Sequence, residues 1–197
     1  MSRIVYVNGQ YVPEDQGKVS IFDRGFLFAD GVYEVTAIVN GRLVDYEPHM
    51  ERLDRSLAEI RMDWPCTRPE LRAVHDELMK RNTLANGWVY MQITRGSADR
   101  DFKFPKNTPS TLVAFTQAKD LVNNPDAVTG VKVITVPDIR WARRDIKSIM
   151  LLAPVLGGPY SARSSEEPRS RLGCSAGPGC NWLPAFEPPR LPARPAA

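Results

Sequence analysis

The run Val32-Tyr33-Glu34-Val35-Thr36-Ala37-Ile38-Val39 is followed directly by Asn40-Gly41 and then by Arg42-Leu43-Val44. Apolar and polar residues alternate through the middle of the first run, as in a β-strand with one buried face. Asn-Gly suits the two positive-φ positions of a tight hairpin turn. The stretch therefore predicts a strand, a two-residue turn and a second strand, so a β-sheet belongs to this fold.

The same turn signal occurs earlier in the chain, where Ile4 to Val7 and Tyr11-Val12 flank Asn8-Gly9. This arrangement predicts a first hairpin near the N-terminus. Short apolar runs predict three further strands. These strands are expected at Trp88 to Thr94, Leu112 to Gln117 and Val131 to Val136.

Two helices are predicted between these strands. Glu47 to Met62 carries apolar residues at helical spacing with charges between them, and Pro48 can occupy the first turn. Pro69 to Leu84 repeats the pattern. Strands and helices together predict a mixed α/β fold.

Composition excludes several classes of protein. The 26 basic and 23 acidic residues are interspersed and sum to +3, so no basic stripe for nucleic acid is present. No apolar run reaches the ~18 residues of a membrane span, and the first residues lack a signal-peptide core. We therefore expect no nucleic-acid or membrane partner and a cytoplasmic location. The three cysteines form no CxxC pair, so no metal site is expected.

The run Arg143-Arg144-Asp145-Ile146-Lys147-Ser148 places one lysine after two arginines and before the apolar run Ile149-Met150-Leu151-Leu152. A lysine attacks a carbonyl only as the neutral amine, and neighbouring cations and apolar surroundings both disfavour the ammonium form. Lys147 is therefore a candidate Schiff-base lysine. A solvated lysine on a charged surface is the alternative that this run alone leaves open.

The composition changes at Gly157. The last 41 residues hold 8 of the 17 prolines but no lysine, valine or isoleucine, so they cannot present a strand face or a helix stripe. One interpretation is a natural disordered, proline-rich tail that binds a partner. The other is a GC-rich gene read out of frame, because residues with AT-rich codons disappear together. The composition favours the second interpretation.

Four motifs occur in a fixed order along residues 1–156. They are Asp23 to Val35, His49 to Leu53, Gln92 to Gly96, and Asp138 to Trp141 running into Asp145 to Ser148. Together they resemble the class IV aminotransferases, the pyridoxal-phosphate enzymes of fold type IV. The D-amino-acid aminotransferase branch is the most similar. The resemblance implies pyridoxal 5'-phosphate as cofactor and a homodimer as the assembly.

The resemblance also implies a two-lobed fold with a complete N-terminal lobe and a C-terminal lobe that has only begun. We expect the N-terminal α/β lobe at residues 1–119. Residues 120–156 would form a linker and the start of the cofactor-binding lobe, including Lys147. Residues 157–197 would form the Pro/Gly/Arg-rich tail, disordered or out of frame. No stretch after Leu156 resembles the family segments that supply a glutamate for the cofactor's ring nitrogen and a threonine for its phosphate.

The family pattern assigns roles to four residues. Lys147 matches the lysine that holds the cofactor as an imine and moves the proton. Arg52 matches the arginine that pairs with the cofactor phosphate, for which a planar guanidinium is suited. Tyr33 matches an active-site tyrosine near the substrate carboxylate, although its spacing also fits a core position. Arg100 matches an arginine that binds the substrate carboxylate.

The implied function is transamination between an amino acid and a 2-oxo acid, with a D-amino acid such as D-alanine favoured. D-amino-acid aminotransferases typically carry histidine where this chain has Phe102, which cannot donate a hydrogen bond. A branched-chain-amino-acid aminotransferase is therefore an alternative. An aminodeoxychorismate lyase of the same fold resembles the motifs less well. A truncated, inactive product that retains only the N-terminal lobe is the remaining alternative.

Overall fold

The structure is a computed structural model that describes residues 2–124, 129–130 and 140–155. The strand predicted at Val131 to Val136 and the tail predicted at residues 157–197 lie outside the described residues. The division into an N-terminal lobe, a linker and a tail stays a prediction.

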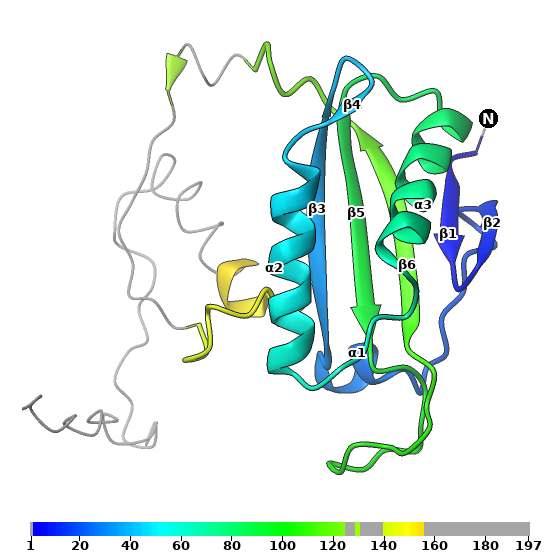
Figure 1. The fold of residues 1–197 in the computed structure, drawn as a ribbon, viewed down its shortest axis with the longest axis vertical. Helices are drawn as coiled ribbons and strands as arrows, with labels where there is room; N and C mark the ends of the chain where they lie inside the picture. The colour runs from blue at the N-terminus through cyan, green and yellow to red at the C-terminus, as the bar shows by residue number, and fades with distance from the viewer. Residues whose placement is uncertain (1, 125–128, 131–139, 156–197) are drawn as a thin grey trace, which may run out of the picture.

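A six-stranded antiparallel sheet with the strand order β2-β1-β6-β5-β3-β4 forms the centre of the described chain (Figure 1). The strands are β1 (Ile4–Val7), β2 (Gln10–Pro13), β3 (Gly31–Val39), β4 (Arg42–Leu43), β5 (Gly87–Thr94) and β6 (Thr111–Ala118). The strands predicted at Trp88 to Thr94 and at Leu112 to Gln117 are thus confirmed as β5 and β6.

Both predicted hairpins are confirmed, and both turns have the backbone that Asn-Gly favours. Asn8 and Gly9 have φ values of 46° and 92°, and Asn40 and Gly41 have φ values of 49° and 72°. Positive φ at both central positions matches the right-handed twist of the flanking strands. The second hairpin is short, because β4 pairs only with the end of β3, at Ile38 and Val39.

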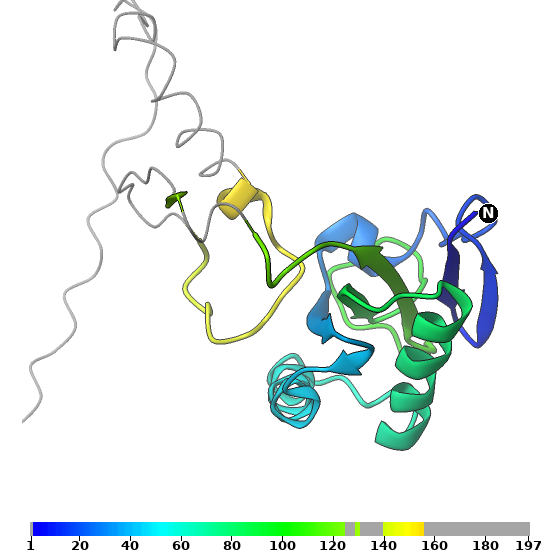
Figure 2. The same cartoon turned by 90° about the horizontal axis from the view of Figure 1, so that it is seen from above.

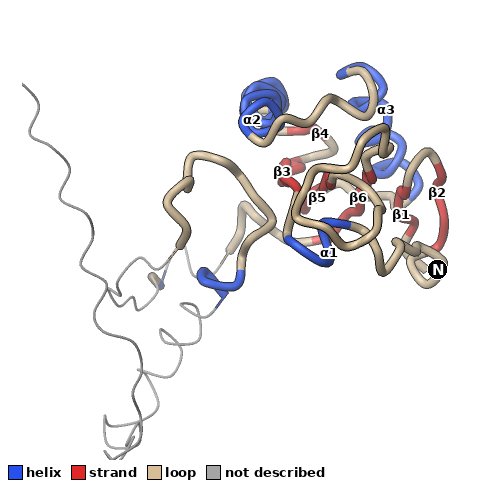
Figure 3. The backbone as a smooth tube through the Cα atoms, turned by 90° about the horizontal axis from the view of Figure 1, so that it is seen from below, coloured by secondary structure: helices blue, strands red, loops and turns tan. Residues whose placement is uncertain are grey.

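The two predicted helices are confirmed as α2 (Tyr46–Glu59) and α3 (Arg68–Arg81). Both lie on the same face of the sheet (Figures 2 and 3). The α3 start is fixed by a capping box, in which Thr67 and Glu70 each bond to the other's main chain. A third helix, α1 (Arg24–Phe28), was not predicted. No helix among the described residues is both long and apolar enough to cross a bilayer.

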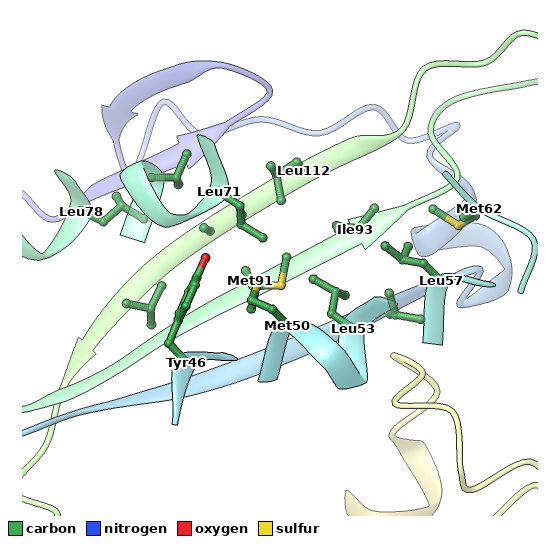
Figure 4. Close-up of a cluster of buried hydrophobic side chains, with 14 of the residues drawn as sticks. Tyr46, Met50, Leu53, Leu57, Met62, Leu71, Leu78, Met91, Ile93 and Leu112 are labelled. Atoms are coloured by element: carbon green, nitrogen blue, oxygen red, sulfur yellow. The ribbon is translucent and has the colours of Figure 1, made fainter. Parts of the chain in front are cut away.

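The core lies between the sheet and these two helices (Figure 4). Apolar side chains of α2 and α3 meet the covered faces of β3, β5 and β6. Fully buried members include Met50, Leu53, Leu71, Met91 and Ile93. Burial of each such side chain contributes about 1.5–3 kcal/mol, so this layer supplies most of the hydrophobic stabilisation.

The covered face of β3 differs from what its alternating pattern favours. The apolar residues Val35, Ala37 and Val39 are only partly buried, whereas Glu34 and Thr36 are fully buried. Val32 and Ile38 complete the buried face. The strand therefore packs a carboxylate under the helices, which requires a charged partner there.

His75 of α3 provides a test of this core. Its side chain is fully buried, and its Nδ1 lies 2.9 Å from the carbonyl oxygen of Leu71. Burial lowers the pKa of His75, and the hydrogen bond to Leu71 offsets only part of that effect.

In the unfolded chain His75 becomes protonated below about pH 6.5, whereas in the folded chain its lowered pKa keeps it neutral to a lower pH. The free energy of unfolding is therefore highest above that pH and falls as the pH decreases below it. We expect the free energy of unfolding to fall by up to about 1.4 kcal/mol per pH unit in this range. In His75→Asn, which can still donate to Leu71 but cannot titrate, this loss should be absent. Urea unfolding between about pH 7.5 and 5.5 measures the difference; equal slopes in both proteins would contradict the prediction.

Candidate active site

The segment that contains Lys147 pairs with the edge of β3. The Tyr33 amide donates to the Lys147 carbonyl oxygen at 3.1 Å, and the Ile149 amide donates to the Gly31 carbonyl oxygen at 3.2 Å. The Lys147 amide donates to Ser56 Oγ of α2 at 3.3 Å. Main-chain bonds to a strand and a side chain of a helix thus fix the backbone of the lysine.

The Lys147 side chain lies on the face of the sheet opposite α2 and α3, which we call the open face. Its Nζ lies 4.3 Å from the ring centroid of Tyr33. The Tyr33 ring stacks on Tyr90 at 5.6 Å between centroids, and Tyr90 stacks on Phe115 at 4.9 Å. Three neighbouring strands therefore present a flat aromatic row to the amine.

Tyr90 connects this row to a cavity of about 350 Å³, whose lining includes Phe26, Gln92 and Ile149. Burial raises the pKa of Tyr90 to about 12. Its hydroxyl therefore keeps its proton at neutral pH and donates to Gln92 Oε1 at 2.8 Å. The middle of the row is thus held in place by a hydrogen bond as well as by stacking.

The residues next to Lys147 in the sequence do not surround its amine as predicted from the sequence. Met150 and Leu152 are exposed, so this apolar run does not enclose the amine. Arg143 points to Glu59 and Asp145, with Nη2 at 2.6 Å and 2.9 Å from their carboxylate oxygens. The structure instead brings the ring of Tyr33, from a distant strand, against the amine.

Arg52 of α2 binds Glu34, the buried carboxylate of β3. Its Nε lies 2.7 Å from Oε1 and its Nη2 lies 2.6 Å from Oε2. His49, one turn earlier, places Nδ1 2.8 Å from Oε2. The hydrogen bond to Glu34 is the main cause that raises the pKa of Arg52. Glu34 is fully buried, whereas 42% of the Arg52 side chain is exposed, so the cation faces outward from a buried anchor.

Neither Glu34 nor His49 was predicted as a site residue. A signal was present, because Glu34 directly follows Tyr33, and His49 and Arg52 are one helical turn apart. The sequence alone did not show that α2 covers the face of β3 from which Glu34 projects.

A second charged network fixes the start of β3. Asp30 accepts hydrogen bonds from Arg24 Nε at 2.7 Å and from Arg95 Nε at 2.8 Å. Burial alone would raise the pKa of Asp30, but hydrogen bonds from Arg95 and Arg24 outweigh it and hold the pKa below its usual value. Arg24 Nη1 also donates to the carbonyl oxygen of Asp101 at 2.7 Å. The network thus ties the loop after β5 to the start of β3.

Arg100 lies in this loop, beside aromatic rings. Its guanidinium carbon is 5.4 Å from the ring centroid of Phe28 and 5.6 Å from that of Phe102. Among the residues that the structure describes, no contact joins Arg100 to Lys147 or Tyr33. The structure therefore brings together Lys147 and Tyr33 at one stretch of β3, with Arg52 on Glu34 of the same stretch, but leaves Arg100 in a separate loop.

The family model described as amino-transferase class IV matches residues 31–163, which contain the Tyr33, Arg52 and Lys147 positions. The chain belongs to the class IV aminotransferase family. D-alanine aminotransferase from Staphylococcus haemolyticus is 41% identical over 162 residues, which cover 81% of this chain and 56% of that protein. D-alanine aminotransferase from Listeria monocytogenes serotype 4b (strain F2365) is 40% identical over 154 residues, or 77% of this chain and 53% of that protein.

Solved structures of the family share the fold of this aminotransferase chain. The branched-chain amino acid aminotransferase from Escherichia coli superposes with a TM-score of 0.64 at 17% identity, over 81% of this chain and 51% of that one. The enzyme from Thermoproteus uzoniensis superposes with a TM-score of 0.53 at 24% identity, over 60% and 41%. The fold is therefore that of the fold type IV aminotransferases, and the chain spans about half the length of the curated relatives it matches.

The Asp30 network can be tested by replacing Asp30 with asparagine. The substitution leaves two nearly buried guanidinium groups, those of Arg24 and Arg95, without their counter-charge. We expect the free energy of unfolding to fall by about 3–5 kcal/mol. Tryptic cleavage in the 97–110 loop should also become faster, because Arg24 no longer holds it.

Asp76→Asn is the matched control, since Asp76 pairs with Arg72 on the exposed surface of α3. Its expected cost is below about 1 kcal/mol. Urea unfolding measures the free energy of unfolding of both variants. Equal losses in the two variants would contradict the prediction that Asp30 balances the charge of two nearly buried guanidinium groups.

Proposed function

We propose that this chain carries the active-site half of a pyridoxal-phosphate-dependent aminotransferase that exchanges an amino group between an amino acid and a 2-oxo acid. The observation that carries the proposal is the contact between the Lys147 amine and the Tyr33 ring. Glu34, the next residue after Tyr33, binds Arg52 through its carboxylate. A D-amino acid such as D-alanine is the favoured substrate. The relatives named D-alanine aminotransferase support this choice.

The chemistry of these groups fits a phosphorylated aromatic aldehyde. Lys147 offers a primary amine and Tyr33 a flat ring on the open face. Arg52 extends from α2 with a partly exposed guanidinium, and it lies near enough to Tyr33 for that side chain to be among the causes that raise the pKa of Arg52. Arginine is suited to phosphate because it donates two parallel hydrogen bonds. When bound, pyridoxal phosphate supplies an aldehyde that takes up amino groups and a ring that acts as an electron sink.

The residues of this chain have separate tasks in the proposed reaction. Arg52 would bind the phosphate and so orient the cofactor. The Tyr33 ring keeps the Lys147 side chain on the open face, where an amino acid has access to it. Nζ of Lys147 would then take the proton from the substrate Cα and return it, because a positioned amine is a suitable general base.

Substrate recognition would depend on Arg100, whose charge matches a carboxylate. The exposed Phe102 beside it cannot donate a hydrogen bond, and this feature favours the branched-chain alternative. We further propose that the enzyme acts as a homodimer, as its family implies, and that its location is cytoplasmic, as the composition of the sequence predicts.

The lysine is tested by adding pyridoxal phosphate to the chain and to Lys147→Ala. We expect a visible absorption band distinct from that of free pyridoxal phosphate for the first protein and no such band for the second, because only Lys147 would bind the aldehyde covalently. Lys106→Ala, which removes an exposed lysine of the 97–110 loop, is the control and should keep the band. A band of equal strength in Lys147→Ala, or none in the unmodified chain, would refute the proposal.

The substrate is tested by measuring transamination with D-alanine and with branched-chain L-amino acids. We expect turnover of D-alanine, and Arg100→Ala should raise the KM at least about tenfold because a charge-assisted contact to the carboxylate is lost. Arg100→Lys should recover part of the loss. An unchanged KM would remove Arg100 from the carboxylate site, and turnover of branched-chain substrates alone would select the alternative.

A further inference from the structure

Two hydrogen bonds to Glu34 hold the guanidinium of Arg52. We propose that Glu34 is a positioning residue, which fixes the guanidinium of Arg52 so that its remaining donor edge faces a phosphate group. The inference rests on the proposed function, because the phosphate is taken to be that of pyridoxal phosphate.

The contacts of Arg52 leave one edge for a ligand. A guanidinium has five N–H donors in one plane. Glu34 occupies Nε and one hydrogen of Nη2, at 2.7 Å and 2.6 Å. Among the described residues, Nη1 has no hydrogen-bond partner. His49 Nδ1 lies 3.1 Å from Nη2 as well, but an Nδ1–H that donates to Glu34 Oε2 cannot accept a hydrogen bond from Nη2. With that tautomer of His49, Nη1 and the second hydrogen of Nη2 form a pair of parallel donors without an acceptor among the described residues, which is the arrangement that a phosphate binds bidentately.

Glu34 can fix this edge because it is itself immobile. Its side chain is fully buried, and its main chain lies within the β3–β5 ladder opposite Met91. His49 Nδ1, 2.8 Å from Oε2, restrains the same carboxylate oxygen that accepts from Nη2. A long arginine side chain loses much rotational freedom on binding a ligand. Two bonds to a fixed carboxylate remove that freedom before the ligand arrives.

A purely structural role makes the opposite prediction about phosphate binding. The carboxylate repels a nearby anion, so if Glu34 only joined β3 to α2, removing its charge would strengthen phosphate binding. If Glu34 positions Arg52, removing it weakens binding despite the lost repulsion. The sign of the change in affinity therefore separates the two roles in variants that keep the fold.

Two substitutions use this difference. Glu34→Gln keeps the size of the side chain but offers Arg52 an amide, which can accept at only one of the two positions. Glu34→Asp keeps the charge but withdraws the carboxylate by one methylene, so it remains informative if the glutamine variant does not fold. We expect both to weaken phosphate binding at least about tenfold, the scale seen when supporting partners of binding groups are lost.

Glu51→Gln is the matched control. Glu51 precedes Arg52 on α2, is exposed, and has no contact with the Arg52 guanidinium among the described residues. It loses the same charge without changing the position of Arg52, so its phosphate affinity should stay equal or rise slightly. Thermal unfolding of every variant identifies any change that is due to loss of the fold.

Two probes are titrated into each protein. Pyridoxal phosphate is followed by its visible absorption, and inorganic phosphate is followed by NMR of the arginine Nε–H signals, with Arg52→Lys identifying the Arg52 signal. Weaker binding in Glu34→Gln and Glu34→Asp, but not in Glu51→Gln, supports the inference. Equal or tighter binding in the Glu34 variants overturns it and leaves the proposed function intact.

The two proposals also fail separately. If the unmodified chain shows no pyridoxal-phosphate band but inorganic phosphate shifts the Arg52 signal, and shifts it less in Glu34→Gln, the proposed function fails and the positioning role stands. If neither ligand binds the unmodified chain, both are overturned.

Discussion

The short reach of β4 determines where the site forms. Because β4 pairs only with Ile38 and Val39, the first residues of β3 have no strand beside them on that side. Their backbone N–H and C=O groups are therefore available for hydrogen bonds to another segment. Residues 147–149 supply it through main-chain hydrogen bonds. Glycine at position 31 is required mainly by β5 on the other side of the strand, because a Cβ there would lie 2.6 Å from the carbonyl oxygen of Ile93, whereas Ile149 Cδ1 of the lysine segment would lie at 3.3 Å. The backbone of the lysine is thus positioned by the sheet edge, and its side chain then contacts the Tyr33 ring.

Two carboxylates bracket this stretch of β3, and each binds arginine. Asp30 precedes the strand and pairs with Arg24 and Arg95, whereas Glu34 lies within it and pairs with Arg52. Pairs of this kind add little net stability, because desolvation offsets most of the attraction. They do fix geometry, since a bidentate pair has one favoured arrangement. The strand between them can therefore hold Tyr33 in a constant position for the incoming lysine segment.

Local signals in the sequence predicted the elements but not the face of β3. The Asn-Gly turns and the helical spacing of α2 and α3 depend on neighbouring residues, so the sequence contains them directly. Alternation in β3 also predicts a strand, but it does not decide which side is buried. The apolar Val35 favours burial of the face that carries Val35, whereas the partners that α2 provides for Glu34 allow the opposite face to be buried. Helix α1, with five residues, is too short to show a period.

The candidate site shows the same division between local and distant information. Motif order predicts that Lys147, Arg52 and Tyr33 belong to one site, but the sequence could not give the contact between the lysine and the tyrosine, which are 114 positions apart. The position of Arg100 depends on residues still farther away in the sequence. Arg24 binds the loop that contains Arg100, and Asp30 in turn binds Arg24. The residue that would recognise the substrate is thus connected to the start of the strand that presents Tyr33. A change in the charge at Asp30 would therefore disturb two places together, the loop that carries Arg100 and the start of the strand that carries Tyr33.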